Sequence, residues 1–249
     1  MMKIIKYKKG SKGLYKVELD DGRSLALYEE VILKFNLLLT KEILETDLSD
    51  IEKYNLECDV YYVALNSLKS RFKSVYDTKE YLLKKEYPLD LVEMAVDKLV
   101  SQGYLNDRSY AKGFINNKMV TSNMGPNKIR KELLEHKISL DIINEELVVF
   151  EEELQLEKIN KIVDKLIRSN HTRGGFVLKK KITNDLVMLG YDVDLINKVI
   201  SEYDFSNDKD MVKKEYDKLY KRLSRKYSGN ELEYKIKEKL YQKGLYYEE

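Results

Sequence analysis

The chain has 249 residues, of which 35% are charged and only two are proline, a composition that favours helices and argues against a turn-rich β-sandwich. Its formal net charge of +2 excludes a uniformly basic or acidic protein, so a preference for a charged partner must come from local segregation of charge. The single cysteine excludes a disulfide framework, and no apolar run is long enough for a signal peptide or a membrane span, so we expect a cytoplasmic protein with no membrane partner.

Residues 1–48 are predicted to form a β-rich N-terminal extension and a linking helix. The stretches "KIIKYKK", "LYKVELDDG" and "RSLALYEE" alternate polar and apolar residues around the Asp21-Gly22 turn signal, which is typical of a β-hairpin. The stretch "EEVILKFN" then begins the helical part. A sheet this small needs a helix to pack against.

One pattern then returns three times along the chain. Asp90, Asp141 and Asp194 follow one another at intervals of 51 and 53 residues, and each stands two positions after a predicted helix cap. An apolar stripe at i, i+4 and i+7 accompanies each aspartate, as in a helix that faces a core. The stripes consist of Val92, Val96 and Leu99; Ile143, Leu147 and Phe150; and Ile196, Ile200 and Tyr203. Each unit is therefore predicted to hold three short helices, A, B and C, with the aspartate in the first turn of helix C.

The match also runs upstream into helix B and adds a partial fourth copy. The aligned leucines are Leu82, Leu133, Leu186 and Leu240. Gly190 and Gly244 stand where helix B ends and the chain turns, because a left-handed cap favours glycine. Glu86 and Lys137 occupy the same place in the first two copies without that advantage.

These limits predict the domain organisation. Helical repeats 1, 2 and 3 cover 49–107, 108–156 and 157–206, and a partial fourth repeat covers 207–249. One unit of this size has too small a core to be stable alone, so the units are expected to stack end to end. The predicted fold class is mainly α, with tandem three-helix repeats forming an elongated curved array and a small N-terminal β element. No proline or glycine interrupts residues 127–173, so helix C of repeat 2 is expected to continue directly into helix A of repeat 3.

Charge is segregated with the period of the repeat. Residues 108–137 carry seven basic and two acidic residues and 158–181 carry eight and one, whereas 141–157 carry seven acidic and no basic residues. In a stack, the basic helices would form a surface for a polyanion or an acidic protein. The candidate residues for binding a protein partner or nucleic acid are Lys69, Arg71, Lys73, Arg108, Lys112, Lys118, Lys128, Arg130, Lys131, Arg173, Lys179, Lys180 and Lys181. The alternative is a solvated face on which acidic and basic helices pair with each other.

No pattern in the sequence indicates catalysis, a metal site or a cofactor. The two histidines, His136 and His171, have no cysteine or spaced carboxylates around them, which disfavours metal binding. The stretch "RGGF" at 173–176 lacks the ending of a phosphate-binding loop, so its two glycines are interpreted as a flexible loop between helices A and B. Cys58 is interpreted as a small, partly buried side chain. We therefore expect a protein without enzymatic activity.

Three segments resemble a known family. These are "ALNSLKSRF", "GYLNDRSYA" and "GPNKIRKELLEHKISLDIINEEL". Residues 103–111 are similar to the Gly-Tyr-Leu-Asp-Asp-x-x-Phe-Ala segment of the RecX regulatory family, with Asn106 in place of the first aspartate and Tyr110 in place of the phenylalanine. The resemblance covers about residues 60–205, and the β-rich start is similar to the extension of longer members. Two features depart from the family: the first two repeats lack the glycine after helix B, and the fourth stops at Glu249 before a helix C.

The resemblance implies a non-catalytic protein that binds the filament of the RecA recombinase on DNA. It would inhibit or modulate the recombinase, ATPase and co-protease activities of RecA, and so tune recombination and the DNA-damage (SOS) response. A monomer without a cofactor is expected, in weak direct contact with the DNA. The alternative hypothesis is a helical-repeat protein that acts by binding single-stranded or duplex DNA directly.

Overall fold

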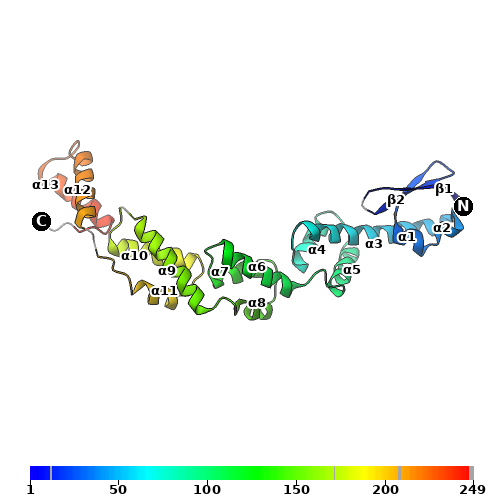
Figure 1. Cartoon of the computed structure of the whole chain (residues 1–249). Coiled ribbons are helices and arrows are strands. Elements are labelled where there is room, and N and C mark those ends of the chain that lie inside the picture. The colour runs from blue at the N-terminus through cyan, green and yellow to red at the C-terminus, as the bar shows by residue number, and fades with distance from the viewer. Residues whose placement is uncertain (12, 171, 207–208, 247–249) are drawn as a thin grey trace. The chain divides into compact units, whose positions relative to one another are not determined.

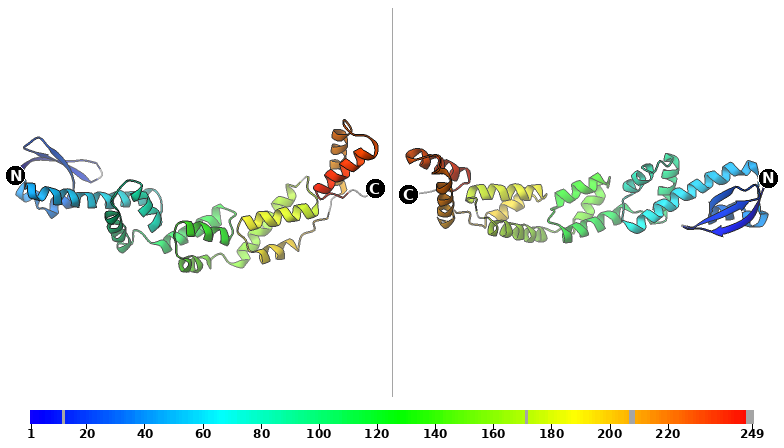
Figure 2. Two further views of the ribbon diagram at one scale, coloured as in Figure 1. Left: turned by 180° about the vertical axis from the view of Figure 1, so that it is seen from behind. Right: turned by 90° about the horizontal axis from the view of Figure 1, so that it is seen from above.

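The computed structural model describes the chain except for residues 12, 171, 207–208 and 247–249. The described part is mainly helical and has a small N-terminal antiparallel sheet, as predicted (Figure 1). The start of the predicted fourth repeat at residue 207 and its end at Glu249 lie outside the described residues. The chain divides into two compact units, Met1–Tyr110 and Ala111–Glu249, which are described in turn. Figure 2 shows the elements of each unit from two further sides.

Within the described residues, the sheet of the first unit has the strand order β3-β2-β1-β4, and all neighbouring strands are antiparallel. The strands are β1 (Met2–Lys9), β2 (Leu14–Leu19), β3 (Ser24–Tyr28) and β4 (Glu42–Ile43). The hairpin at Asp21-Gly22 is confirmed: Gly22 has a φ of 86°, and the Arg23 N–H donates to Asp21 Oδ1 at 2.9 Å. Strand β4 was not predicted, because two residues are too few for a periodic pattern.

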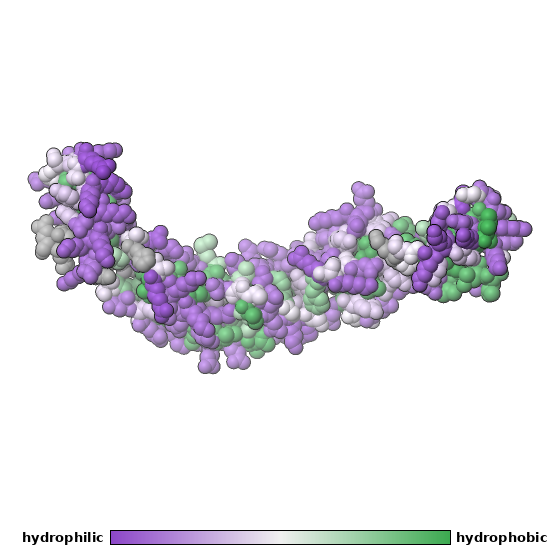
Figure 3. Space-filling view, turned by 45° about the horizontal axis from the view of Figure 1, so that its top comes forward, coloured by the Kyte–Doolittle hydropathy of each residue, from purple (hydrophilic) through white to green (hydrophobic). Residues whose placement is uncertain are grey.

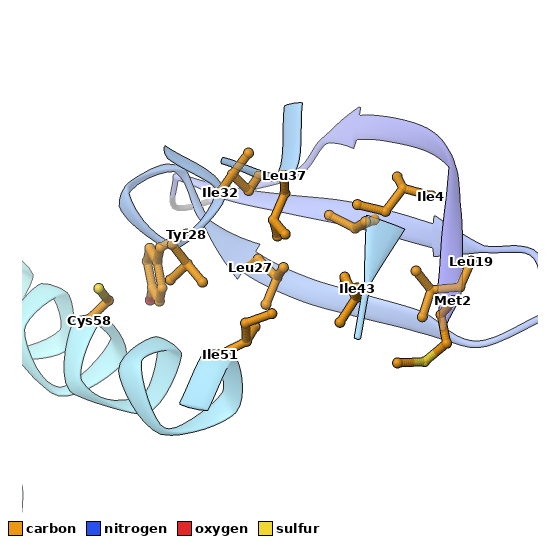
Figure 4. Close-up of a cluster of buried hydrophobic side chains, with 12 residues drawn as sticks. Met2, Ile4, Leu19, Leu27, Tyr28, Ile32, Leu37, Ile43, Ile51 and Cys58 are labelled. Carbon is orange, nitrogen blue, oxygen red and sulfur yellow. The ribbon is translucent and has the colours of Figure 1, made fainter. Parts of the chain in front are cut away.

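The sheet packs on the first long helix of the chain, α3 (Glu45–Ser70), as expected from its size. Two short helices, α1 (Glu29–Lys34) and α2 (Leu37–Thr40), lead from β3 towards it. Leu19 and Leu27 of the sheet share a buried cluster with Ile51 and Cys58 of α3 (Figure 4). The burial of this cluster explains the alternating pattern of the strands.

Polar contacts also attach α3 to β3. The Asn55 side chain on α3 accepts from the Tyr28 N–H at 3.0 Å and donates to the Ala26 carbonyl at 3.0 Å, so it supplies one donor and one acceptor to the strand backbone. Asp59, one turn further along α3, accepts from the Tyr28 hydroxyl at 2.7 Å and from the Tyr87 hydroxyl at 2.5 Å. Because Tyr87 lies in the first repeat, Asp59 ties the sheet to that repeat.

The remaining helices follow the predicted order A, B, C. They are α4 (Val75–Leu83), α5 (Leu89–Ser101), α6 (Asp107–Thr121), α7 (Pro126–Glu135), α8 (Leu140–Leu147), α9 (Glu152–Arg168), α10 (Gly175–Met188), α11 (Val193–Ile200), α12 (Lys209–Leu223) and α13 (Gly229–Gln242). Helices α3–α5 and α9–α11 pack as three-helix units, and α12 and α13 pack as a pair. Helix α7 packs on α8, and the Lys118–Glu132 ion pair joins α6 to α7. The residue limits of the repeats stay a prediction.

The predicted stripes and caps are confirmed. Asp90, Asp141 and Asp194 each lie two positions after the N-cap of α5, α8 or α11, where a carboxylate is favoured by the helix dipole. All residues of the three stripes are buried except Tyr203, which is half-buried. The four aligned leucines of helix B are at most 1% exposed. The repeat in the sequence is therefore a repeat of core positions.

The expected continuous helix between repeats 2 and 3 is wrong. Helix α8 ends at Leu147 and α9 begins at Glu152. Between them, Phe150 turns into the core and is 3% exposed; its N–H donates to the Leu147 carbonyl, and its carbonyl accepts from Gln155 Nε2 at 2.8 Å. The break therefore follows from burial of an aromatic side chain, with no glycine or proline involved.

Consecutive repeats of the second unit are joined by their main chains. The Gly125 N–H, before α7, donates to the Leu189 carbonyl at the end of α10 at 2.7 Å, and the Asn127 N–H donates to the Gly190 carbonyl at 3.0 Å. The Gly174 N–H, before α10, donates to the Lys243 carbonyl after α13 at 2.7 Å. Each joint thus pairs the free N–H groups at the start of one helix B with the free carbonyls at the end of the next. The same contact is used twice.

This joint explains the glycines after helix B. Gly190 has a φ of 89°, and a Cβ there would lie 2.3 Å from the backbone nitrogen of Lys128. Gly244 has a φ of 72°, and its Cβ would lie 2.7 Å from Val177 Cγ2. Glu86 and Lys137 adopt the same left-handed conformation with a side chain, at φ 64° and 58°. Close approach of the preceding helix B, and not the turn alone, therefore demands glycine at 190 and 244.

Tyr191, next to the first joint, leads to a pH prediction. It is 2% exposed, burial raises the pKa of its hydroxyl to about 12, and the hydroxyl has no hydrogen-bond partner within the described part of the chain. A raised pKa favours the neutral form in the folded state, so stability should be fully present below about pH 10 and fall as the pH rises towards 12. We expect Tyr191→Phe to stabilise the protein by about 1 kcal/mol at pH 7 and to reduce the alkaline loss.

Urea midpoints measured at pH 7 and near pH 11 check this prediction. Tyr110 and Tyr203 also have pKa values raised to about 12, chiefly by burial, so part of the loss should remain in the variant. An unchanged alkaline loss in Tyr191→Phe, together with no gain at pH 7, would contradict it.

Candidate interaction surface on the basic helices

Four of the predicted binding residues lie in the first unit. Lys69 is in the last turn of α3 and donates to Asn66 Oδ1 at 2.9 Å, and Arg71 follows it, exposed, as the C-cap. Lys73 covers the Tyr81 ring at 3.6 Å from its centroid, and burial lowers the pKa of its ammonium group. Arg108 is in the first turn of α6. Of these, the Lys73 side chain is held against the protein.

In the second unit, three of the predicted residues are engaged by neighbouring side chains. Lys118 pairs with Glu132 of α7 at 2.6 Å and also lies over the Phe114 ring. Arg130 donates to Asn127 Oδ1 at 2.8 Å, and Lys181 pairs with Asp185 at 2.5 Å. Lys118 and Lys181 are therefore paired with acidic side chains of the protein itself, as the alternative interpretation of the basic residues expects.

Five other predicted residues of this unit are exposed. Among the described residues, their side chains have no ion-pair partner. They are Lys112, Lys131, Arg173, Lys179 and Lys180. Hydrophilic residues dominate the face shown in Figure 3, with hydrophobic residues exposed between them. These five cations are available to an anionic partner.

Helices α9 and α10 line a groove, and Lys128 of α7 also contributes to its lining. Its cationic rim consists of Lys128 from α7 and Lys161 and Lys165 from α9, and its volume is about 600 Å³. Its apolar lining consists of Ile162, Leu166, Met188 and Leu189, and Asn123 and Asp185 complete the wall. The groove brings one predicted residue, Lys128, together with two cations of the next helix A. We call it the basic groove.

The basic residues of α9 are not among the predicted binding residues. Lys161, Lys165 and Arg168 are spaced i, i+4 and i+7, which places them on one side of the helix, and all three line a shallow hollow beside the basic groove. That spacing was the signal that could have identified them. Lys158, one turn earlier, has a structural role: its ammonium group donates to the carbonyls of Met119 and Ser122 at the end of α6.

The described part of the chain contains no cluster of three or more His, Cys, Asp or Glu side chains able to hold a metal ion. His136 packs with its ring edge-on to Phe114, and His171 lies outside the described residues. Burial and the nearby Glu30 raise the pKa of the Cys58 thiol, which disfavours the reactive thiolate. No described helix has both the length and the apolar character that a membrane span requires.

The fold defines a class of protein: tandem three-helix repeats that follow a small N-terminal sheet. A family model described as "RecX, second three-helix domain" matches residues 106–147. The chain belongs to the RecX family of regulatory proteins, because it is 32% identical to the regulatory protein RecX of Lactococcus lactis subsp. cremoris (strain MG1363) over 100% of its own length and 96% of that protein.

Further comparisons agree. The regulatory protein RecX of Streptococcus sanguinis (strain SK36) is 30% identical, with 98% of this chain and 95% of that protein covered. A crystal structure of regulatory protein RecX has a similar fold, with a TM-score of 0.69 and 24% identity, over 81% of this chain and 100% of that one. A second crystal structure, of RecX from Lactobacillus salivarius, has a TM-score of 0.56 and 25% identity, over 60% of this chain and 97% of that one.

Proposed function

We propose that this protein is a non-catalytic regulator that binds the RecA nucleoprotein filament and inhibits or modulates its recombinase, ATPase and co-protease activities. Membership of a family whose relatives are named regulatory proteins supports the proposal. The single structural observation that carries it is the set of exposed cations on helices A and B without acidic partners among the described residues. Such cations suit an acidic protein surface or the DNA of a filament.

The repeated joint supports a multivalent mode of binding. Repeats 2 and 3, and repeat 3 and the following helix pair, are linked by the same contact between main-chain N–H and carbonyl groups. The joint thus links α7 and α10, both of which carry basic side chains, and a filament also offers equivalent sites at regular intervals. Several weak contacts made at once give a high overall affinity.

The first test is the rate of ATP hydrolysis by preformed RecA filaments on single-stranded DNA as the protein is added at substoichiometric ratios. We expect hydrolysis to fall well before one protein is present per protomer, with little binding to naked DNA in a parallel titration. No change in hydrolysis at any ratio would reject the proposed function.

Charge reversal of the α7 cations is the next prediction. We expect Lys128→Glu, Arg130→Glu and Lys131→Glu together to raise the protein concentration needed for half-inhibition by about tenfold or more, because attraction becomes repulsion at one binding face. Circular dichroism should show unchanged helical content. Full inhibition by this triple variant would exclude the α7 face from the interaction.

A matched control separates local from overall charge. Lys6, Lys8 and Lys9 of β1 are exposed, and reversing them to glutamate makes the same change in net charge far along the sequence from the repeats. We expect this control to inhibit nearly as well as the unmodified protein. Equal loss in both triple variants would mean that only the net charge matters.

The second candidate function is direct binding to single-stranded or duplex DNA. The exposed Lys179 and Lys180 on α10, with Arg173 just before it, favour it, because unpartnered cations close together suit phosphates. It predicts tight binding to naked strands that weakens steeply as salt rises, because each neutralised phosphate releases counterions. Weak binding to naked strands at near-physiological salt, alongside filament inhibition, would reject it in favour of the first.

A further inference from the structure

The basic groove has an apolar floor that no polyanion requires. Met188 at the end of α10 is 76% exposed, and Ile162, Leu166 and Leu189 beside it are half-buried. Exposed apolar area costs about 25 cal/mol per Å², so the groove would gain from an apolar occupant. Methionine is unbranched and polarizable, and so adapts its shape to different apolar partners.

The rim of the groove is positively charged after its internal pairs are taken into account. Asp185, the acidic residue of the lining, is paired with Lys181. Lys161 is paired with Glu157 on its own helix. Lys128 and Lys165 have no ion-pair partner in the described ranges of the chain. Two unpaired ammonium groups therefore border the apolar floor.

The combination of two unpaired ammonium groups with an apolar floor distinguishes between a nucleic acid and an acidic peptide as the ligand. A nucleic acid would offer phosphates to the lysines, but its bases bind mainly by stacking on aromatic rings, and none of the lining residues is aromatic. A protein segment that carries carboxylates on both sides of a large aliphatic side chain would satisfy the lysines and cover the floor at once. The lining therefore favours a peptide.

The walls of the groove come from two repeats and are held together by the joint. Asn123 and Lys128 belong to repeat 2, whereas the α9 and α10 residues belong to repeat 3. The hydrogen bond from the Asn127 N–H to the Gly190 carbonyl, 3.0 Å long, fixes Lys128 beside the end of α10. A pre-formed groove spares the ordering cost that binding would otherwise carry.

We propose that the basic groove is a docking site for an acidic peptide segment with large aliphatic side chains, which inserts them between Met188 and Leu166 while its carboxylates meet Lys128 and Lys165. This docking site rests on the proposed function for its biological partner, and it specifies the chemistry of one contact with that partner. The site itself is testable without any recombinase.

The test is a binding titration of the full chain with a fluorescein-labelled helical peptide in which leucines recur at every third or fourth position between glutamates. We expect saturable binding that weakens about tenfold or more in Lys128→Glu/Lys165→Glu and in Met188→Asp. Lys6→Glu/Lys8→Glu, at two exposed positions of β1, and Met94→Asp, a 57% exposed methionine in the first unit, are the matched controls and should bind normally. A peptide with alanine in place of leucine should bind at least tenfold more weakly, because it cannot cover the floor.

Three results would overturn the proposal. These are no binding of the leucine peptide, equal binding of the alanine peptide, or binding of labelled oligothymidylate that competes with the peptide and depends equally on Met188. The proposed function and the docking site can fail independently of each other. Peptide binding with the expected variant pattern, alongside unchanged ATP hydrolysis by RecA filaments, would retain the groove and reject the filament regulator. Filament inhibition without peptide binding would retain the filament regulator and reject the groove as a peptide site.

Discussion

Gly190→Ala is expected to lower the free energy of unfolding by about 3–5 kcal/mol and to separate repeat 2 from repeat 3. The left-handed conformation alone costs an alanine about 1–2 kcal/mol. In addition, the new Cβ would lie 2.3 Å from the Lys128 backbone nitrogen, so the joint must open. Its two hydrogen bonds, each contributing about 1 kcal/mol, would be lost with it.

Gly103→Ala is the matched control for this variant. Gly103 has a comparable φ of 76°, but a Cβ there meets no atom of the described residues within 4 Å. Gly103→Ala should therefore lower the free energy of unfolding only by the cost of the left-handed conformation, about 1–2 kcal/mol. Urea unfolding followed by circular dichroism measures both variants, and we expect an additional transition only in Gly190→Ala, because uncoupled repeats unfold separately. Equal losses in the two variants would contradict the role of the joint.

Asp59→Ala is expected to destabilise the first unit by about 2–3 kcal/mol. The carboxylate accepts from two tyrosine hydroxyls, and the Tyr28 side chain is only 4% exposed, so its hydroxyl would be left without a partner in the core. Hydrogen bonds to a charged acceptor are also stronger than neutral ones. The loss should appear in the urea midpoint and in the tyrosine signal of near-ultraviolet circular dichroism.

Asp50→Ala provides the comparison on the same helix. Asp50 is an exposed residue of α3, so its loss should change stability by no more than about 0.5 kcal/mol. Asp59→Asn keeps acceptor capacity for one tyrosine and should fall between the two. If Asp59→Ala were as stable as Asp50→Ala, the two tyrosine hydrogen bonds would contribute nothing to holding the sheet on the first repeat.

The helical repeat could be predicted from the sequence because it is a local signal. A stripe such as Val92, Val96 and Leu99 is written within one helix, and its recurrence marks the core of each unit. The break before Phe150 could not be predicted, because the stripe places Phe150 on the core face whether or not the helix ends before it. Tertiary packing overrode a helix-permissive sequence there.

The glycines show the same limit of prediction from local sequence. The sequence predicts a flexible loop at Gly174 and Gly175, but both are buried at the start of α10. A Cβ on Gly175 would lie 1.4 Å from the Phe205 carbonyl oxygen. A glycine that allows close backbone approach cannot be told from one in a loop when its neighbour is far away in sequence. Gly190 was placed correctly at a helix end, but its contact with Lys128 was not foreseeable.

The candidate surface was predictable as a charged region but not residue by residue. Lys118 and Lys131 lie in the same basic stretch, yet Lys118 is paired with Glu132 and Lys131 is exposed without a pair among the described residues. Which lysine meets an acid depends on helix packing. The basic groove was missed for a related reason: its walls come from two repeats, and charge counting within each stretch does not place them side by side.

The joint between repeats has a consequence for how this protein can change during evolution. Apart from the space that glycine leaves, it is made by main-chain N–H and carbonyl groups, which every residue except proline carries. Substitutions on the outward faces of α7, α10 and α13 therefore leave the atoms of the joint in place. The surface offered to a partner can diverge from one repeat to the next while the rise from repeat to repeat is inherited unchanged.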